Sequence, residues 1–226
     1  MGSRDAWRGC ATLRRPIMPP RRKPTTRSTS AHATPLTPAD FPPASVHTGV
    51  DAAQIRAQGG EIERLRFVGC ELAGADLSRL RFEDCLFERC NLASVKLSGT
   101  ALRNVAFVDC KLLGAVFADC DDMLFSVGFT ECQLRYASFV GRRMAGTSFT
   151  RCALPDADFS EADLSQATFD ECDLARAIFH RTRLLGADFT TAIDFSLDPE
   201  LNALEGARFA LRGLPGLLVK YGVVVE

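Results

Sequence analysis

Large apolar residues recur at every fifth position over most of this chain. The series runs from Ile62 to Phe117 and resumes from Leu124 to Phe189, with one step of seven residues between the two runs. Five residues rotate an α-helix by roughly 500°, so these positions form no stripe on a helix. On a flat strand, an odd spacing sends successive side chains to opposite faces. A chain that buries every fifth residue must therefore turn by a quarter circle in each pentad.

A second set of inward positions supports this geometry. Small residues lie two positions before the large ones, and a spacing of two on an extended segment returns to the same face. Two series with a period of twenty follow from four such corners per turn. One consists of Cys70, Cys90, Cys110, Cys132, Cys152 and Cys172, and the other of Phe67, Phe87, Phe107, Phe129, Phe149, Phe169 and Phe189. Stacked at the strand spacing of ~4.8 Å, residues 62–189 are expected to form about 6.3 turns, a rod about 30 Å long.

The pentads match the motif A(D/N)LXX in segments such as AGADLSRL, DADFSEADLSQATFDECDL and LLGADFT. On these residues the chain resembles the pentapeptide-repeat family over roughly residues 61–226. That family is all-β and folds as a right-handed quadrilateral β-helix. The segment TTAIDFSLDPELNALEGARFALRGLPGLLVKYGVVVE resembles the C-terminal module of the Qnr-type subgroup, which includes albicidin- and microcin-resistance relatives. Those proteins resemble B-form DNA, bind DNA gyrase and often topoisomerase IV, and protect it from drugs or toxins.

Residues 1–60 differ from the rest of the chain. They hold eight of the eleven prolines and carry a charge of +6, from nine Lys and Arg and three Asp, whereas residues 61–226 carry −7. With few large apolar residues, this segment is expected to be disordered. The chain is thus divided into a basic tail at 1–60, a β-helix at 61–195 and a C-terminal cap and dimerisation module at 196–226. The acidic balance of the β-helix argues against direct nucleic-acid binding by the body.

Other features limit the location and the chemistry. The chain has no apolar run of about 18 residues and no apolar core of a secretory signal, so we expect a cytoplasmic protein that does not cross a membrane, with its nine cysteines reduced. Inward cysteines twenty residues apart lack the close pairs of zinc sites and favour core packing. The three histidines, His32, His47 and His180, form no catalytic motif, and the chain has no P-loop, GxGxxG or HExxH sequence. We expect no enzyme, no metal and no cofactor.

Carboxylates mark a candidate partner-binding surface. Residues 156–173 contain neither Lys nor Arg. Their outward positions hold seven acidic residues: Asp156, Asp158, Glu161, Asp163, Asp170, Glu171 and Asp173. These residues span almost one turn, so they should surround the rod and could stand in for DNA phosphates. The alternative is that Asp fills the outward position of the motif and keeps the rod hydrated. A second acidic group, Asp119, Asp121 and Asp122, lies at the seven-residue step.

Two irregularities are expected. The seven-residue step, ADCDDML, must bulge or form a short loop, and Arg142 occupies an inward slot beside Met144 that should disturb the coil locally. Qnr-type relatives carry larger loops that matter for drug protection. The short step here therefore favours a likeness to the loop-poor, toxin-immunity relatives over quinolone protection.

The C-terminal module is the expected assembly site. Apolar residues at helical spacing predict a capping helix, and the valines after them predict a short strand. The resemblance adds a symmetric homodimer through this module. The residues assigned to it are Leu211, Leu214, Leu217, Leu218, Tyr221, Val223 and Val225.

The sequence thus predicts a non-enzymatic DNA mimic. It would bind DNA gyrase or another type II topoisomerase, such as topoisomerase IV, and limit its poisoning by an antibiotic or toxin. The alternatives are a structural scaffold with another partner and a nucleic-acid binder that acts through the Arg21-Arg22-Lys23 cluster of the tail. A continuous negative stripe along the rod would favour the mimic, and mixed charge would favour the scaffold.

Overall fold

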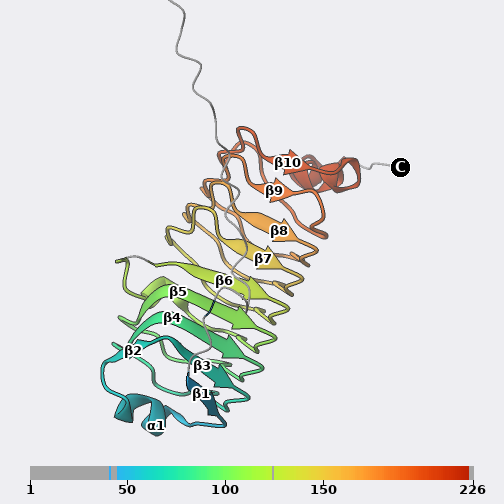
Figure 1. Ribbon diagram of the computed structural model, residues 1–226. Coiled ribbons are helices and arrows are strands. Elements are labelled where there is room, and N and C mark those ends of the chain that lie inside the picture. Colours follow the sequence, from blue (N-terminus) through green and yellow to red (C-terminus); the bar gives the residue numbers. More distant parts are fainter. Residues whose placement is uncertain (1–40, 42–44, 124, 224–226) are drawn as a thin grey trace, which may run out of the picture. The chain divides into compact units, whose positions relative to one another are not determined.

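One face of the body is a ladder of parallel strands, each about twenty residues after the last (Figure 1). The structure is a computed structural model that describes residues 41, 45–123 and 125–223, all within one compact unit. The strands stack as β1-β3-β4-β5-β6-β7-β8-β9-β10, and β2 also pairs with β4. Their bounds are Ser45–Thr48 (β1), Glu61–Glu63 (β2), Leu65–Val68 (β3), Arg81–Glu88 (β4), Ala101–Val108 (β5), Val127–Thr130 (β6), Ser148–Thr150 (β7), Thr168–Asp170 (β8), Asp188–Phe189 (β9) and Arg208–Phe209 (β10).

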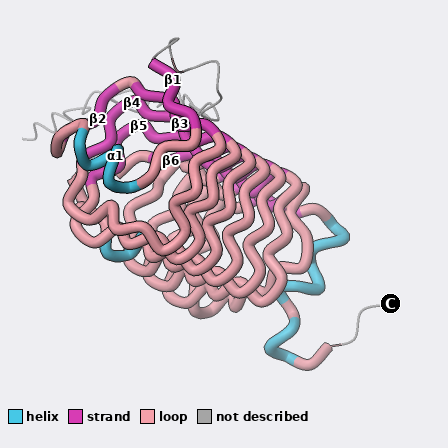
Figure 2. The backbone as a smooth tube through the Cα atoms, turned by 90° about the horizontal axis from the view of Figure 1, so that it is seen from below, coloured by secondary structure: helices cyan, strands magenta, loops and turns pink. Residues whose placement is uncertain are grey.

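The backbone register confirms the twenty-residue period and its single interruption. Phe87 lies opposite Phe107, whereas Phe107 lies opposite Phe129, twenty-two residues on. Single bridges repeat the period on the other faces, such as Glu71 with Asn91. The nine stacked strands define eight steps, so the body is a quadrilateral β-helix of about eight turns whose corners lie in register (Figure 2).

Stacked phenylalanine rings fill the coil. On the strand face, successive rings from Phe67 to Phe189 are parallel and 4.7–5.4 Å apart. A second column from Phe117 to Phe179 stacks at 4.9–5.1 Å. The two columns meet edge to face, as between Phe149 and Phe159 at 5.8 Å, an arrangement that aromatic quadrupoles favour. The predicted pile of Phe129, Phe149 and Phe169 in register is confirmed.

The predicted inward cysteines are buried, and they also hydrogen-bond the corners. At corners such as 134–137, the Ala137 amide donates to the Leu134 carbonyl at 3.0 Å and closes its own turn. At the corner 67–70, Cys90 of the next turn replaces this bond. Its Sγ accepts from the Cys70 amide at 3.4 Å and donates to the Phe67 carbonyl at 3.5 Å. Because a buried polar group without a partner is costly, a thiol fits this column better than a methyl group does.

Corner residues point outward and have an unusual backbone. Among the described residues, seventeen other than glycine have positive φ, and most of them lie two positions after a central apolar residue, as Asp109 (51°), Glu161 (60°) and Glu171 (51°) do. This conformation costs about 1 kcal/mol or more for a residue with a Cβ. The regular stacking of the turns stabilises this backbone conformation at each successive corner. Long charged side chains therefore line the edges of the coil.

The N-terminal end is closed by residues that were expected to be disordered. Strand β1 pairs with β3, and helix α1 (Ala52–Ala57) covers the end of the coil. Asp51 and Gln54 form a capping box, and Ile55 is buried in the core with 1% of its surface exposed. The prediction of disorder is therefore wrong for residues 45–60. Residues 1–40, with the Arg21-Arg22-Lys23 cluster, lie outside the described residues.

The C-terminal end carries 3₁₀ helices. The predicted capping helix is two short pieces, η3 (Leu211–Leu217) and η4 (Val219–Tyr221), with Pro215 inside the first. A 3₁₀ helix suits this segment because proline and two glycines interrupt any longer α-helical run. Val223 is not in a strand, so the predicted strand is wrong at that residue, and Val225 lies outside the described residues.

The seven-residue step forms the predicted loop, and Arg142 organises it. The short helix η2 (Phe117–Asp119) begins the loop. Arg142 is 3% exposed, and its guanidinium donates to the carbonyls of Ala118, Cys120 and Asp121 at 3.3, 2.7 and 3.1 Å. These bonds satisfy carbonyls that the interrupted ladder leaves without backbone partners. The disturbance expected beside Met144 is not seen: the Arg142 amide donates to the Phe139 carbonyl at 3.0 Å, as at regular corners. Leu124 lies outside the described residues.

Candidate functional site

The seven carboxylates of the acidic turn, residues 156–173, surround the coil as predicted. Four of them, Asp158, Asp163, Asp170 and Asp173, flank buried central residues on four successive faces. The other three have positive φ and lie at corners: Asp156, Glu161 and Glu171. No single face therefore gathers them. A partner that contacts all seven must enclose the coil.

Several of these carboxylates are already engaged. Asp156 bonds Arg176 at 2.7 Å and Arg135 at 3.5 Å, and the hydrogen bond from Arg176 holds the pKa of Asp156 below its usual value. Asp163 lies 3.8 Å from Arg183. The remaining members make local hydrogen bonds or none: Asp158 accepts from the Ser160 amide, Asp173 from the Ala175 amide and Asp170 from the Thr191 hydroxyl. Among the described residues, the side chains of Glu161 and Glu171 make no ion pair or hydrogen bond.

Acidic residues on the coil are matched by arginines one turn later. Nine ion pairs of the described residues join positions twenty apart. Arg56 of α1 pairs with Asp76, and the other eight have the carboxylate first: Glu61–Arg81, Glu83–Arg103, Asp122–Arg142, Glu131–Arg151, Asp156–Arg176, Asp163–Arg183, Asp188–Arg208 and Glu200–Lys220. The two signs therefore alternate along the axis. The described surface carries mixed charge and not a continuous negative stripe.

The second acidic group projects from the seven-residue step. Asp119, Asp121 and Asp122 are all exposed at the surface. Asp122 pairs with the buried Arg142 at 2.7 Å, and Asp121 accepts from the Met123 amide at 2.7 Å. The ring of Phe125 lies 4.5 Å from the Arg142 guanidinium, a cation–π contact that fixes the other side of the loop. The loop is thus held by its own contacts, and most of its acidic groups already take part in them.

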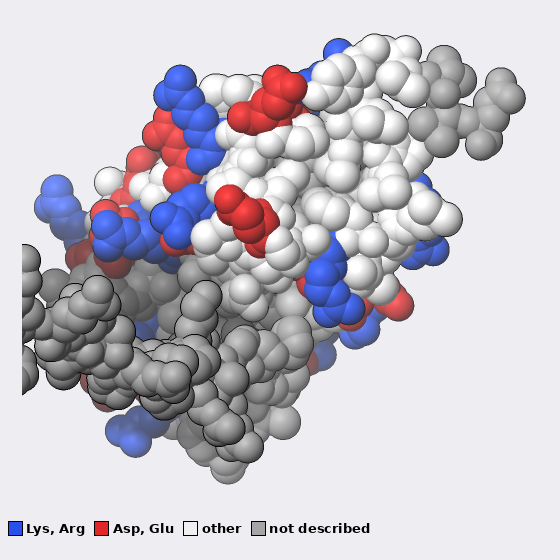
Figure 3. All heavy atoms as spheres, turned by 90° about the horizontal axis from the view of Figure 1, so that it is seen from above, with Lys and Arg blue, Asp and Glu red and all other residues white. Residues whose placement is uncertain are grey.

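The C-terminal cap, residues 196–223 as described, exposes most of the apolar residues predicted to form a dimer. Leu211 is 84% exposed, and Leu214, Tyr221 and Val223 are also exposed, while Leu217 and Leu218 are half-buried. Seen from the C-terminal end, a broad area without charged side chains lies among scattered acidic and basic groups (Figure 3). A cavity of about 600 Å³ is lined both by residues 192–196 and by the 3₁₀ segment of the cap.

The 3₁₀ helices of the cap are fixed to the segment 195–200, which follows the last full turn, at two places. Leu197 donates its amide to the Gly216 carbonyl at 3.0 Å, and a Cβ on Gly216 would lie 2.3 Å from the Phe195 carbonyl oxygen. On the outside, Lys220 contacts Asp198 at 2.6 Å and Glu200 at 2.7 Å. Burial opposes the charged ammonium, but these two carboxylates raise the pKa of Lys220 overall, and its hydrogen bonds lower the pKa values of both acids.

The described residues hold no cluster of three or more metal-ligating side chains. Burial raises the pKa of the Cys85 thiol to about 11 and that of Cys120 to about 12, so both stay protonated at neutral pH. In the described part of the chain, no helix is long and apolar enough to span a bilayer.

Comparison with known proteins decides the family. The model of the pentapeptide repeat region matches residues 60–124 and 123–189, more than half of the chain. The chain belongs to the pentapeptide-repeat family. Among solved structures it is similar to a trypsin-treated variant of QnrB1, described as a plasmid-mediated fluoroquinolone resistance protein. The TM-score is 0.58 at 19% identity, and the match covers 81% of this chain and 99% of that one.

A second solved structure is more distant. HetL, a pentapeptide-repeat protein involved in heterocyst differentiation regulation in the cyanobacterium Nostoc sp., matches with a TM-score of 0.40 at 16% identity, over 71% of this chain and 93% of that one. A search of curated proteins gave no match. At these identities the similarity establishes a Qnr-like pentapeptide-repeat fold.

Proposed function

We propose that this pentapeptide-repeat protein is a non-enzymatic interaction protein that binds DNA gyrase or a related type II topoisomerase. It would occupy the groove that normally holds duplex DNA and protect the enzyme from a poison, in the cytoplasm where that enzyme acts. The observation that carries the proposal is the acidic turn. It places carboxylates on all four faces of a narrow coil, as phosphates surround a duplex, and Glu161 and Glu171 are free to meet basic groups.

The surface also decides what kind of mimicry is possible. Duplex DNA carries one charge per about 1.7 Å of axis. The coil cannot approach that density because arginines one turn later neutralise many of its acids. Recognition would therefore rest on shape and on a few unpaired carboxylates, with complementary charge steering the encounter. The similarity to QnrB1, described as a resistance protein, agrees with this function.

A second candidate function has its own support. The ion pairs between turns make the surface mixed in sign, which is what a scaffold for another protein partner would show. The same coil would then bind a partner that is not a DNA-binding enzyme. The two candidates differ in whether duplex DNA competes with this protein for its partner.

A gyrase supercoiling assay tests the proposal. Purified full-length protein is titrated into the reaction with and without a gyrase poison, and we expect rescue from the poison or inhibition of supercoiling at micromolar protein. The variant Glu161→Lys/Glu171→Lys should weaken the effect about tenfold or more, because two carboxylates would become repulsive. Asp109→Lys is the matched control, since Asp109 is an unpaired corner carboxylate on an earlier turn. No effect of the wild-type protein at micromolar concentration would eliminate gyrase as the partner.

A further inference from the structure

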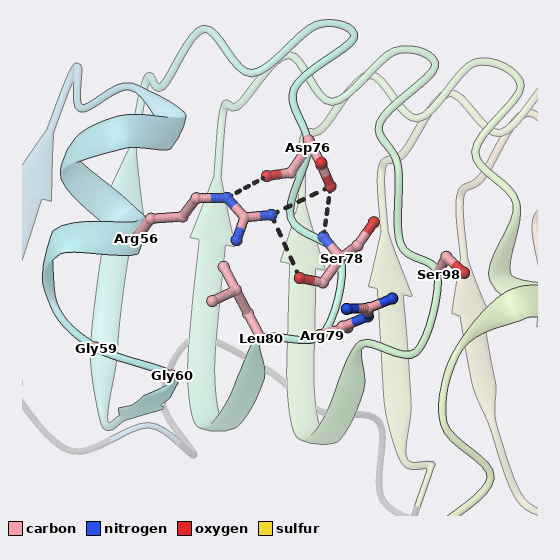
Figure 4. Close-up of a pocket in the computed structure, with 8 residues that line it drawn as sticks. All are labelled: Arg56, Gly59, Gly60, Asp76, Ser78, Arg79, Leu80 and Ser98. Atoms are coloured by element: carbon pink, nitrogen blue, oxygen red, sulfur yellow. Dashed lines mark hydrogen bonds and ion pairs between the residues drawn. The ribbon is translucent and has the colours of Figure 1, made fainter.

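A polar cavity of about 720 Å³ opens where the N-terminal cap meets the first turns of the coil. Its walls are the end of α1 at Arg56, the Gly59–Gly60 segment, the corner Ser78–Leu80 and Ser98 from the next turn (Figure 4). None of these residues belongs to the acidic turn or to the C-terminal cap. The cavity is therefore separate from the surfaces proposed to bind the topoisomerase and a second copy.

One wall carries a guanidinium that the protein itself holds in place. Arg56 Nε donates to the Asp76 carbonyl at 3.0 Å, and Nη2 donates to the Ser78 carbonyl at 3.3 Å and lies 3.2 Å from Asp76 Oδ1. These contacts leave the Nη1 donors of Arg56 without a partner among the described residues. An arginine that is already oriented loses little conformational entropy when it binds an anion.

The opposite wall carries an arginine whose guanidinium has no partner among the described residues. Arg79 lies at a corner with φ of 61°, and its side chain crosses toward Ser98 (Figure 4). Its Cγ lies 3.6 Å from where a Cβ on Gly99 would be, so the side chain passes over the corner of the next turn. Within the described part of the chain the guanidinium of Arg79 makes no hydrogen bond or ion pair, although its backbone amide donates to the Ser98 carbonyl at 3.0 Å. Five N–H donors are thus available beside the cavity.

The local charge selects the class of ligand. Hydrogen bonds from Ser78 lower the pKa of Asp76, so this carboxylate is ionised at neutral pH. Among the lining residues, the two cations Arg56 and Arg79 thus face one anion, which leaves a net charge of +1. A phosphate group offers enough acceptor oxygens for two guanidinium groups at once, whereas a carboxylate offers only two.

We propose that this cavity binds a phosphate group, either free or as the monoester of a small molecule, through Arg79 and the Nη1 donors of Arg56. Bidentate arginine contacts match the geometry of phosphate oxygens. The open cavity has room for more than the phosphate itself, and the Leu80 side chain would contact the esterified part. The N-terminal end of the coil would then bind a small ligand independently of the surfaces proposed to bind proteins.

Isothermal titration calorimetry of the full chain tests this site. Inorganic phosphate, glycerol phosphate and acetate are the probes, at constant ionic strength set with chloride. We expect saturable binding of one phosphate per chain, with acetate at least tenfold weaker. Saturation by inorganic phosphate alone would assign the free ion, and tighter binding of glycerol phosphate would assign a monoester. The proposal is overturned if neither inorganic phosphate nor glycerol phosphate saturates, or if acetate binds as tightly as they do.

Three variants separate this site from the basic tail and from folding effects. Arg79→Gln removes an exposed, unpaired group and should weaken phosphate binding at least tenfold, or about 1.4 kcal/mol. Arg181→Gln is the matched control, because Arg181 is an unpaired corner arginine of the described coil, far along the chain from the cavity, with φ of 55°. Asp76→Asn removes the competing carboxylate and should bind phosphate at least as tightly as the wild type. Equal losses in Arg79→Gln and Arg181→Gln, or no loss in Arg79→Gln, would refute the site.

Discussion

The two ends of the coil are completed in different ways. At the N-terminal end, strand β1 extends the ladder, and α1 inserts Ile55 into the core with 1% of its surface exposed. At the C-terminal end, η3 and η4 bury none of their residues fully, and Leu211 is 84% exposed. An uncovered coil end exposes apolar core and unpaired strand edges, which favour association. The N-terminal end is thus closed by its own chain, whereas the C-terminal end keeps apolar surface that a second copy could cover.

The largest expected effect comes from truncating Ile55, the side chain of α1 that is buried at the N-terminal end of the core. Ile55→Ala should lower the free energy of unfolding by about 2–5 kcal/mol, because it leaves a cavity among buried side chains. Leu211→Ala, at the open end, should change it by less than about 0.5 kcal/mol, since an exposed side chain loses little on truncation. Urea unfolding followed by circular dichroism measures both. Equal losses would show that the ends do not differ in this way.

The next effect concerns how the cap attaches to the coil. A methyl group at Gly216 would collide with the Phe195 carbonyl, so Gly216→Ala should cost about 1–3 kcal/mol and loosen the cap. Gly60→Ala is the control at the other end, because no heavy atom lies within 4 Å of its Cβ position. Hydrogen exchange of residues 197–221 should accelerate in the first variant alone. Unchanged exchange there would mean that the cap is held by other contacts.

A third prediction addresses the proposed pairing at the open end. Leu211→Glu/Val219→Glu places charges on exposed apolar positions, so it should weaken a dimer at least tenfold without lowering the melting temperature of the monomer. Sedimentation velocity over a range of concentrations measures the dissociation constant. Glu71→Gln, far from the cap, serves as a control. A wild-type chain that stays monomeric at high micromolar concentration would refute the dimer.

The smallest effect is the pH dependence of the cap. Interactions with Lys220 lower the pKa values of Asp198 and Glu200, so their stabilising contribution is complete above the ordinary carboxyl range, near pH 4, and is lost as the pH falls through the lowered values. The pKa of Lys220 is raised, so its contribution is complete below about pH 10 and is lost above that. Melting curves of the wild type and Lys220→Met should converge below about pH 3. A constant difference across this range would contradict the assignment.

The sequence predicts the structure of the coil well and that of its two ends poorly. The spacing of five predicted the stacked phenylalanines, the buried cysteines and the loop at the seven-residue step, because one burial rule repeats in every turn. It did not predict that Arg142 keeps a regular corner and reaches the loop carbonyls with its guanidinium. The order of residues 45–60 was missed, since β1 and α1 follow no pentad and are held by contacts with β3 and the first turn. The 3₁₀ cap was missed because leucines at helical spacing do not reveal how closely Gly213 and Gly216 pack against Phe195.

The sequence predicted where the acidic residues of the candidate site lie, but not which of them form ion pairs. The carboxylates do surround the acidic turn, yet Asp156 and Asp163 are paired with arginines. Arg176 follows Asp156 by twenty residues, so the period that predicts the coil also contained the signal for this pair. Lys220 contacts Asp198 and Glu200 across the fold of the cap, where no period applies.

Competition with DNA for purified gyrase tests the central proposal most directly. Fluorescence anisotropy of labelled duplex DNA bound to gyrase is followed while the full-length protein is added. The proposal predicts that wild-type protein displaces the DNA at micromolar concentration, that Asp109→Lys does the same, and that Glu161→Lys/Glu171→Lys needs about tenfold more. DNA that stays bound at saturating wild-type protein would contradict occupation of the DNA groove and favour a scaffold with another partner.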